Sequence, residues 1–186
     1  ARAGVRVLQH VRPRLMSRVF TRRFRVRWSE TNADGQVDFA GYLRYLLETA
    51  WDWGSTGGLS LDEVHALGQV WLVRETQLDV LQPLRYNDVF DFTIWLLGWR
   101  RVRGTRAFEL RLQEGGQVVA QGVQQVVVLD AGTMRPTSAP EHLLAYYELD
   151  NPRQIPHQRF PRIPSPPEAA FAMERLTVAH TGLGGK

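Results

Sequence analysis

The residues best suited to acid–base chemistry lie in one short segment, from Glu30 to Glu48. A polar stretch that contains Asp34 and Gln36 comes just before an apolar run that starts at Phe39. An ionised carboxylate can take a proton from water, and amide groups at the start of a helix can hold a developing negative charge. We therefore expect any chemistry of this protein to lie in this segment.

The helix that would carry these amides is expected from Phe39 to about Trp53. This run is mostly apolar and has only three charged residues, so it is too apolar for a surface helix and should be buried. A polar, glycine-containing stretch over residues 30–38 breaks both the helical and the strand period and predicts a loop. Three glycines are expected to end the helix: Gly54, Gly57 and Gly58.

A sheet should surround this helix. Alternation of apolar and charged residues predicts a strand from Phe20 to Ser29, with Phe24, Val26 and Trp28 on its buried face. A capping box at Ser60 predicts a short second helix. Four strand-like stretches follow, near 69–81, 88–100, 104–113 and 117–129, and short turns between them predict an antiparallel meander. The fold class is therefore α+β, with a short closing helix expected over 140–147.

Composition limits the remaining possibilities. The 186 residues carry a net charge of +4 and no cysteine, which excludes disulfides and thiolate chemistry. We expect a basic arm over residues 1–19, one domain over 20–149 and a proline-rich extension over 150–186. No signature of nucleic-acid binding follows the arm, and no apolar run is long enough to span a membrane. Neither nucleic acid nor membrane is an expected partner, and a cytoplasmic location is the default expectation.

Residues 26–50, VRWSETNADGQVDFAGYLRYLLETA, resemble the signature of the hotdog thioesterases. The matching positions are Glu30, Gly35, Tyr42, Leu43 and Tyr45, and weaker similarity extends over residues 22–147. The resemblance implies a single hotdog fold, an antiparallel sheet wrapped around a long central helix. It also implies hydrolysis of an acyl thioester in fatty acid metabolism, with acyl-CoA or an acyl carrier protein as the substrate.

Two branches of this superfamily direct attention to the same loop. In the 4-hydroxybenzoyl-CoA thioesterase branch, the attacking acid falls on Asn32 and the oxyanion amide on Phe39. In the acyl-ACP thioesterase branch, an Asp-x-Asn-x-His pattern falls on Asn32, Asp34 and Gln36. A neutral amide has no titratable proton, so Asn32 can orient water but cannot act as the base. Asp34 is the first choice for that role.

Other acids are held in reserve, and each has a structural alternative. Glu30, Asp38 and Glu48 are the reserve acids. Asp34 with Gly35 is also a common turn pair, and Asp38 is well placed to cap the helix. Glu48 is expected to pair with an arginine, such as Arg74 or Arg44, or to lie at a dimer interface.

Substrate contacts are expected beside the helix. An apolar tunnel would take the acyl chain, and Tyr42 is a candidate contact. If the carrier is CoA, four arginines could bind its phosphates, although a solvated turn explains them equally well: Arg100, Arg101, Arg103 and Arg106. The five histidines have no metal-ligand spacing, so we expect no metal and no cofactor.

An uncovered sheet edge and helix face predict a homodimer or a larger homo-oligomer. The replacement of the expected Asp by Asn32, and of the expected His by Gln36, leaves a second hypothesis open. In that hypothesis the domain has lost hydrolysis and acts as an acyl-binding or dimerisation module.

Overall fold

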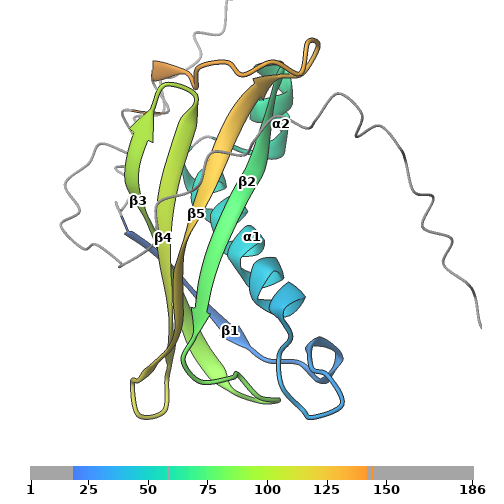
Figure 1. Ribbon diagram of the computed structural model, residues 1–186, viewed down its shortest axis with the longest axis vertical. Coiled ribbons are helices and arrows are strands. Elements are labelled where there is room, and N and C mark those ends of the chain that lie inside the picture. Colours follow the sequence, from blue (N-terminus) through green and yellow to red (C-terminus); the bar gives the residue numbers. More distant parts are fainter. Residues whose placement is uncertain (1–18, 58, 142–143, 145–186) are drawn as a thin grey trace, which may run out of the picture.

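The computed structural model describes residues 19–57, 59–141 and 144. In chain order the elements are β1 (Val19–Arg25), the 3-10 turn η1 (Trp28–Glu30), α1 (Phe39–Thr56), α2 (Leu61–Ala66), β2 (Gln69–Val80), β3 (Val89–Arg100), β4 (Arg103–Leu112) and β5 (Val118–Asp130). The strands form one sheet, and α1 lies across one of its faces (Figure 1). The α+β class is therefore confirmed. The predicted extension 150–186, and the arm apart from its last residue, lie outside the described residues.

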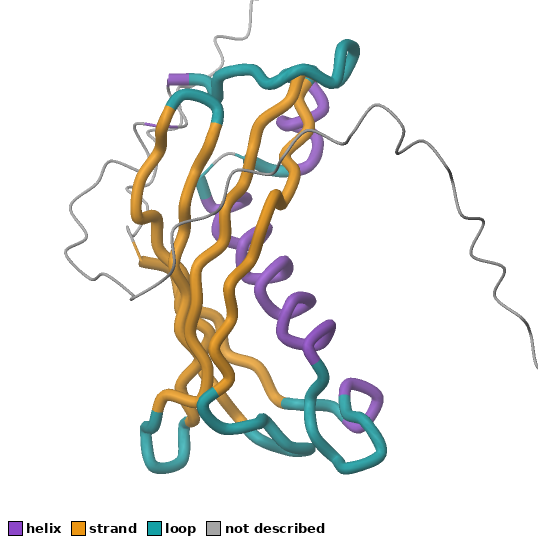
Figure 2. Tube along the Cα trace, viewed as in Figure 1, coloured by secondary structure: helices purple, strands orange, loops and turns teal. Residues whose placement is uncertain are grey.

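The strand order is β1-β3-β4-β5-β2, with every neighbouring pair antiparallel. The four later strands match their expected positions closely, but the expectation of a simple meander is wrong. Only β3, β4 and β5 follow one another as neighbours, whereas β2 pairs with β5 at the far edge. Segment 81–88 cannot be a tight hairpin, because Leu84 is fully buried in the core and Pro83 has no amide hydrogen for a ladder. This segment instead crosses from the edge strand β2 to β3, which lies next to the opposite edge strand β1 (Figure 2).

Strand β1 is shorter than its alternating pattern predicts. The strand ends at Arg25, and Val26 continues into the core with only 1% of its surface exposed. Trp28, expected on the buried face, opens the 3-10 turn and is 70% exposed. The chain turns here because the Val26 amide donates to the Asp88 carbonyl, which joins β1 to the crossover segment.

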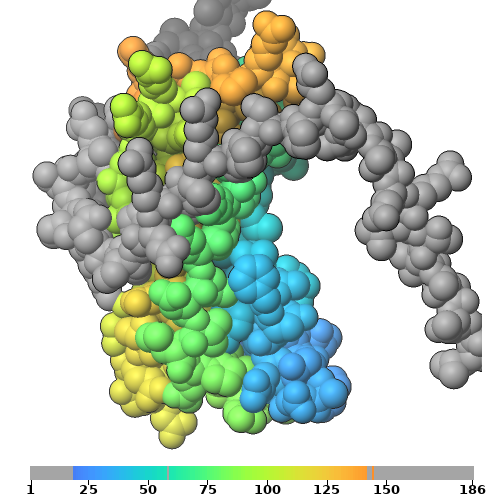
Figure 3. All heavy atoms as spheres, in the orientation of Figure 1, coloured from blue at the N-terminus to red at the C-terminus, as the bar shows by residue number. Residues whose placement is uncertain are grey.

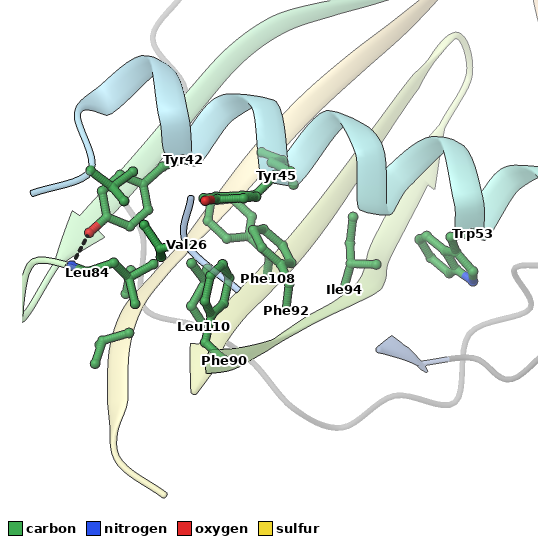
Figure 4. Packing of buried hydrophobic residues seen from close by; sticks show 14 of the residues in the cluster. Val26, Tyr42, Tyr45, Trp53, Leu84, Phe90, Phe92, Ile94, Phe108 and Leu110 are labelled. Carbon is green, nitrogen blue, oxygen red and sulfur yellow. Dashed lines mark hydrogen bonds between the residues drawn. The ribbon is translucent and has the colours of Figure 1, made fainter. Parts of the chain in front are cut away.

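The core lies between α1 and the sheet. Tyr42, Tyr45, Leu46 and Trp53 are buried on one face of the helix, at the spacing of its turns. They pack against side chains from the inner face of the sheet, as Figure 4 shows: Phe90, Phe92, Ile94, Phe108 and Leu110. Complete burial of a large apolar side chain stabilises a fold by about 1.5–3 kcal/mol. The central position of the helix is thus confirmed, but only one of its faces is buried: Phe39, Leu47 and Trp51 are exposed.

Specific side chains cap the N-termini of both helices. Asp38 is the N-cap of α1, and its carboxylate accepts a bond of 2.7 Å from the Gly41 amide. The helix continues past Gly54 to Thr56, and Gly57 is its C-cap. Leu59 packs against Gly54, where a Cβ would lie 3.3 Å from the Leu59 carbonyl oxygen, a tight contact. The predicted capping box of α2 is confirmed at Ser60. Of the expected closing helix, only residues 140, 141 and 144 are described.

Two tyrosines of α1 fix the loops around the helix start. The Tyr42 hydroxyl accepts a bond of 2.9 Å from the amide of Leu84 in the crossover segment (Figure 4). The Tyr45 hydroxyl donates to Glu30 at 2.5 Å, and Glu30 also accepts from the Arg27 amide at 2.8 Å. Burial raises the pKa of Tyr45 strongly, and the Glu30 carboxylate adds to the effect because it favours the protonated hydroxyl.

Gly122→Ala should destabilise the sheet severely. A Cβ at this position would lie 2.1 Å from the Gln77 carbonyl oxygen and 2.6 Å from the Phe108 ring, so neighbouring backbone would have to move. We expect the free energy of unfolding in urea to fall by about 1–3 kcal/mol or more. Gly98→Ala is the matched control, because its Cβ would meet no atom within 4 Å and should change stability by less than about 0.5 kcal/mol. Equal losses in the two variants would contradict this view of Gly122.

Tyr45→Phe should lower the free energy of unfolding by about 1.5–3 kcal/mol at neutral pH, because it removes a hydrogen bond to a charged group. The difference from wild type should shrink above about pH 10, where an unfolded tyrosine ionises. The unfolded wild type then loses its proton before the folded protein does, so wild-type stability falls as pH rises. Urea unfolding at neutral and alkaline pH measures both quantities. A difference that stays constant with pH would refute the linkage.

Candidate active site

The loop before α1 is shaped by the side chain of Asn32. Its amide oxygen accepts bonds from the backbone amides of Asp34 at 3.0 Å and Gln36 at 3.1 Å. The Gly35 amide donates to the Asn32 carbonyl at 3.0 Å, and Gly35 has the positive φ of 70° that such a turn requires. The structure thus gathers Asn32, Asp34 and Gln36 on one turn, with Asn32 holding its backbone.

The tip of this turn carries an exposed acidic side chain. Asp34 is exposed on the loop, whereas Gln36 is half-buried and makes a bridge to Arg85 of the crossover segment. The side-chain oxygen of Asn32 already accepts two backbone hydrogen bonds, so it fixes the shape of the turn. The side-chain nitrogen of Asn32 can still donate hydrogen bonds. Asp34 therefore supplies the carboxylate of this turn. Its role as the base remains a prediction.

The start of α1 lies directly after the turn. Asp38 satisfies the Gly41 amide and lies 3.8 Å from the Arg44 guanidinium. The capping role expected for Asp38 is confirmed. The preceding amides, of Phe39 and Ala40, belong to the first helical turn and have no acceptor within an α-helix. Both residues are exposed, so the positive end of the helix dipole lies at the surface of the molecule.

Glu30 and Glu48 have structural tasks. The Glu30 carboxylate accepts hydrogen bonds from the Tyr45 hydroxyl and the Arg27 amide. The sequence did not predict this anchor. The Glu48 side chain is 57% exposed and lies 3.3 Å from Arg22 of β1, so the expected pairing with an arginine is confirmed, but the partner is Arg22 and not Arg74 or Arg44. Glu48 follows Phe39 by nine residues, about 14 Å along the helix. The structure does not bring Glu48 to the helix start within one chain.

Arg22 also binds Asp52 at 2.5 Å and lies over the Phe24 ring at 4.6 Å. The ion pairs of Arg22 with Glu48 and Asp52 join β1 to α1. Residue spacing could not reveal them, because β1 and α1 are separated by the loop.

The predicted substrate-binding residues are dispersed. Arg100, Arg101 and Arg103 lie at the turn between β3 and β4, at the opposite end of the molecule from the Asn32 turn (Figure 1). Tyr42 is 3% exposed, and its hydroxyl accepts a hydrogen bond from the Leu84 amide. Arg106 lies further along β4, on the inner face of the sheet. The alternation of Arg106 with Phe108 and Leu110 is the sequence signal that could have indicated this orientation.

A pocket lies where α1 adjoins β2, the cyan and green surfaces that meet in Figure 3. Its wall is mostly apolar and includes one charged side chain, that of Arg106. The residues that line it are Leu47, Ala50, Trp51, Gly54, Leu59, Trp71, Val73, Arg106 and Val126. Such a mixture suits an apolar ligand with a polar group. An apolar site beside the helix was expected from the sequence.

Residues 19–57, 59–141 and 144 contain no group of three or more His, Asp or Glu side chains placed to bind a metal ion. Within the same ranges, no helix has the length and apolar character needed to span a bilayer.

Solved structures with this arrangement are numerous. A Lactobacillus plantarum protein, provisionally described as an oleoyl thioesterase, is 18% identical with a TM-score of 0.69; the alignment covers 81% of this chain and 59% of that one. The chain thus spans less than two thirds of that protein. A Synechocystis 1,4-dihydroxy-2-naphthoyl-CoA thioesterase is 20% identical with a TM-score of 0.66, covering 72% of this chain and 99% of that one.

A Staphylococcus aureus protein solved in complex with CoA is also 20% identical, with a TM-score of 0.69 and coverage of 80% and 96%. At these identities the likeness establishes the fold. No curated protein sequence matches the chain significantly. The model of the thioesterase-like superfamily matches residues 26–146, well over half of the chain. The chain therefore belongs to the thioesterase-like superfamily, and its fold is the hotdog fold.

Proposed function

We propose that this protein hydrolyses an acyl thioester at the junction of the Asn32 turn and the start of α1. Membership of the superfamily supports thioester hydrolysis as the general activity. The observation that carries the proposal for this chain is the placement of a loop carboxylate, Asp34, on the turn that leads into α1, whose first residues, Phe39 and Ala40, are exposed.

In the proposed reaction, Asp34 takes a proton from a water molecule as that water attacks the thioester carbonyl carbon. The amides of Phe39 and Ala40 stabilise the negative charge that develops on the carbonyl oxygen. Asn32 and Gln36 orient the water. The tetrahedral intermediate then collapses, the carbon–sulfur bond breaks, and the thiolate leaves and is protonated.

The acyl group would occupy the pocket between α1 and β2, whose apolar wall suits a hydrocarbon. The carrier is either CoA or an acyl carrier protein. The complex of a structural neighbour with CoA supports CoA. The arginines of the β3–β4 turn would bind its phosphates only if a second chain brought them to the site, because they lie far from the Asn32 turn within one chain.

A second candidate function is binding without hydrolysis. One specific observation favours it: Asn32 stands where the family places its acid, and its oxygen is engaged in holding the turn. The domain would then be an acyl-binding or dimerisation module.

Asp34→Ala should lower kcat for acyl-CoA hydrolysis by about 100-fold or more, because a general base contributes about 10²–10⁴-fold. Asp34→Asn, which keeps the size of the side chain, should be equally slow. Asn32→Asp should raise kcat at least about tenfold, since the carboxylate keeps both backbone bonds and adds a base. Steady-state assays over several acyl chain lengths measure these effects.

The outcomes of this experiment separate the two functions. Full activity in Asp34→Ala would remove Asp34 from the mechanism. Absence of hydrolysis by wild type at every chain length would favour the binding function, and hydrolysis by Asn32→Asp alone would identify the lost acid as the cause.

The protein is proposed to be a homodimer. Edge strand β2 has no partner on its outer side among the described strands. Beside it lies a patch of large exposed apolar side chains on α1 and on the face of β2 that adjoins the helix: Leu47, Trp51 and Val73, each 39–43% exposed. A second copy could extend the sheet and cover this patch.

Leu47→Glu should shift the protein from dimer to monomer in analytical ultracentrifugation, because it puts a charge into the covered patch. Ser55→Glu is the control, since it adds the same charge at an exposed polar position of the same helix. A wild type that sediments as a monomer would overturn the proposal.

A further inference from the structure

Two aromatic side chains lie side by side at the surface, outside the core. Trp28 of the 3-10 turn is 70% exposed, and Tyr86 of the crossover segment is 50% exposed. Their ring centroids are 5.7 Å apart and the ring planes meet at 90°, the edge-to-face arrangement that aromatic pairs favour. A large part of each ring remains exposed in this pair, and such a surface can stack on a flat aromatic ligand.

Backbone hydrogen bonds hold the two rings in this arrangement. The Val26 amide donates to the Asp88 carbonyl at 2.9 Å, and the Asn87 amide donates to the Val26 carbonyl at 3.1 Å. Asp88 also closes the turn that carries Tyr86, because its carboxylate accepts a bond of 2.7 Å from the Arg85 amide. The fold thus positions the pair before a ligand binds, which reduces the entropy lost on binding.

The aromatic pair adjoins the turn of the proposed active site. The Tyr86 amide donates to the Gly35 carbonyl at 3.2 Å, and Gly35 precedes Phe39 by four residues, a span of about 14 Å at most. The pantetheine arm of CoA, which separates the thioester from the nucleotide, is as long as about four extended residues, about 14 Å. A thioester bound at the start of α1 would therefore bring the nucleotide of CoA within reach of Trp28 and Tyr86.

Arginines accompany the aromatic pair, and one of them precedes each ring in the sequence. The exposed charged residues of segments 25–36 and 85–88 are three arginines and one acid: Arg25, Arg27, Arg85 and Asp34. The other two acids of these segments, Glu30 and Asp88, are half-buried and accept bonds from backbone amides. The surface beside the rings therefore carries a net positive charge, and guanidinium groups bind phosphate oxygens through paired hydrogen bonds.

We infer that the carrier of the acyl group is CoA, and that Trp28 and Tyr86 bind its adenine while the arginines beside them bind its phosphates. The inference rests on the proposed function for the position of the thioester. An acyl carrier protein presents the same pantetheine arm without an adenine base, so it would leave the aromatic pair without a ligand. The pair therefore discriminates between the two carriers.

The first test compares octanoyl-CoA with octanoyl-pantetheine, which carry the same thioester and differ in the nucleotide. Wild type should hydrolyse octanoyl-CoA with a kcat/KM about 10- to 100-fold higher, because base stacking and the phosphate contacts add to its binding. Trp28→Ala should lower kcat/KM for octanoyl-CoA about 5- to 100-fold, mainly through KM, and leave octanoyl-pantetheine unaffected. Trp28→Phe should retain most of the preference, since it keeps an aromatic ring. Leu61→Ala, which removes an exposed apolar side chain from α2, should change neither rate.

Calorimetric titration with adenosine 3′,5′-bisphosphate, a fragment of CoA without a thioester, measures the nucleotide contacts directly. Wild type should bind this nucleotide, and Trp28→Ala and Tyr86→Ala should each bind it about 5- to 100-fold more weakly. Arg85→Gln should weaken binding and also reduce its dependence on salt, because it removes a charge that attracts the phosphates. Arg135→Gln, which removes an exposed arginine from the loop after β5, should leave binding unchanged.

The outcomes separate this inference from the proposed function. Binding of the nucleotide by wild type and its loss in Trp28→Ala, without hydrolysis of either thioester, would overturn the function and support the nucleotide site. Hydrolysis of both thioesters at equal kcat/KM, without binding of the nucleotide, would support the function and overturn the inference. If Trp28→Ala instead changes the sedimentation of the protein and leaves nucleotide binding intact, the aromatic pair contacts a second copy of the chain, and the inference is wrong.

Discussion

The structure depends on the burial of one face of α1 against the concave side of the sheet. Tyr42, Tyr45, Leu46 and Trp53 occupy that face, and aromatic residues of β3 and β4 fill the space opposite. Interiors of this kind are closely packed, so the helix has one well-defined depth and rotation. Every functional feature follows from this placement, because the first amides, the Asn32 turn and the pocket are all positioned relative to the helix.

The start of the helix is held by polar contacts that belong to different parts of the chain. Tyr45 fixes the turn before the loop through Glu30, and Tyr42 fixes the crossover segment through the Leu84 amide. Gly41 lets Val37 pack against the helix, since a Cβ there would lie 2.5 Å from a Val37 methyl carbon. Shape and chemistry are thus divided among neighbouring residues: the buried Tyr42, Tyr45 and Val37 position the backbone, and the exposed Asp34 carries the carboxylate.

Asn32 shows how such a site can change its chemistry without changing its shape. An asparagine and an aspartate both present a side-chain oxygen that can accept the two backbone bonds of the turn. Exchange of one for the other leaves the turn in place and alters only the presence of a titratable group. Fold and activity are therefore separable at this position, which is why family membership does not by itself fix the mechanism.

The sequence determined the elements whose signals are local. The long helix, the capping roles of Asp38 and Ser60, and the four later strands follow from periodicity and from side chains that bond within three residues. Only the tertiary structure decided what depends on distant segments. It placed β2 beside β5, paired Glu48 with Arg22, exposed Trp28, and turned Arg106 toward the helix. These features have no local signal, because each depends on which strands become neighbours and on which face of the sheet the helix covers.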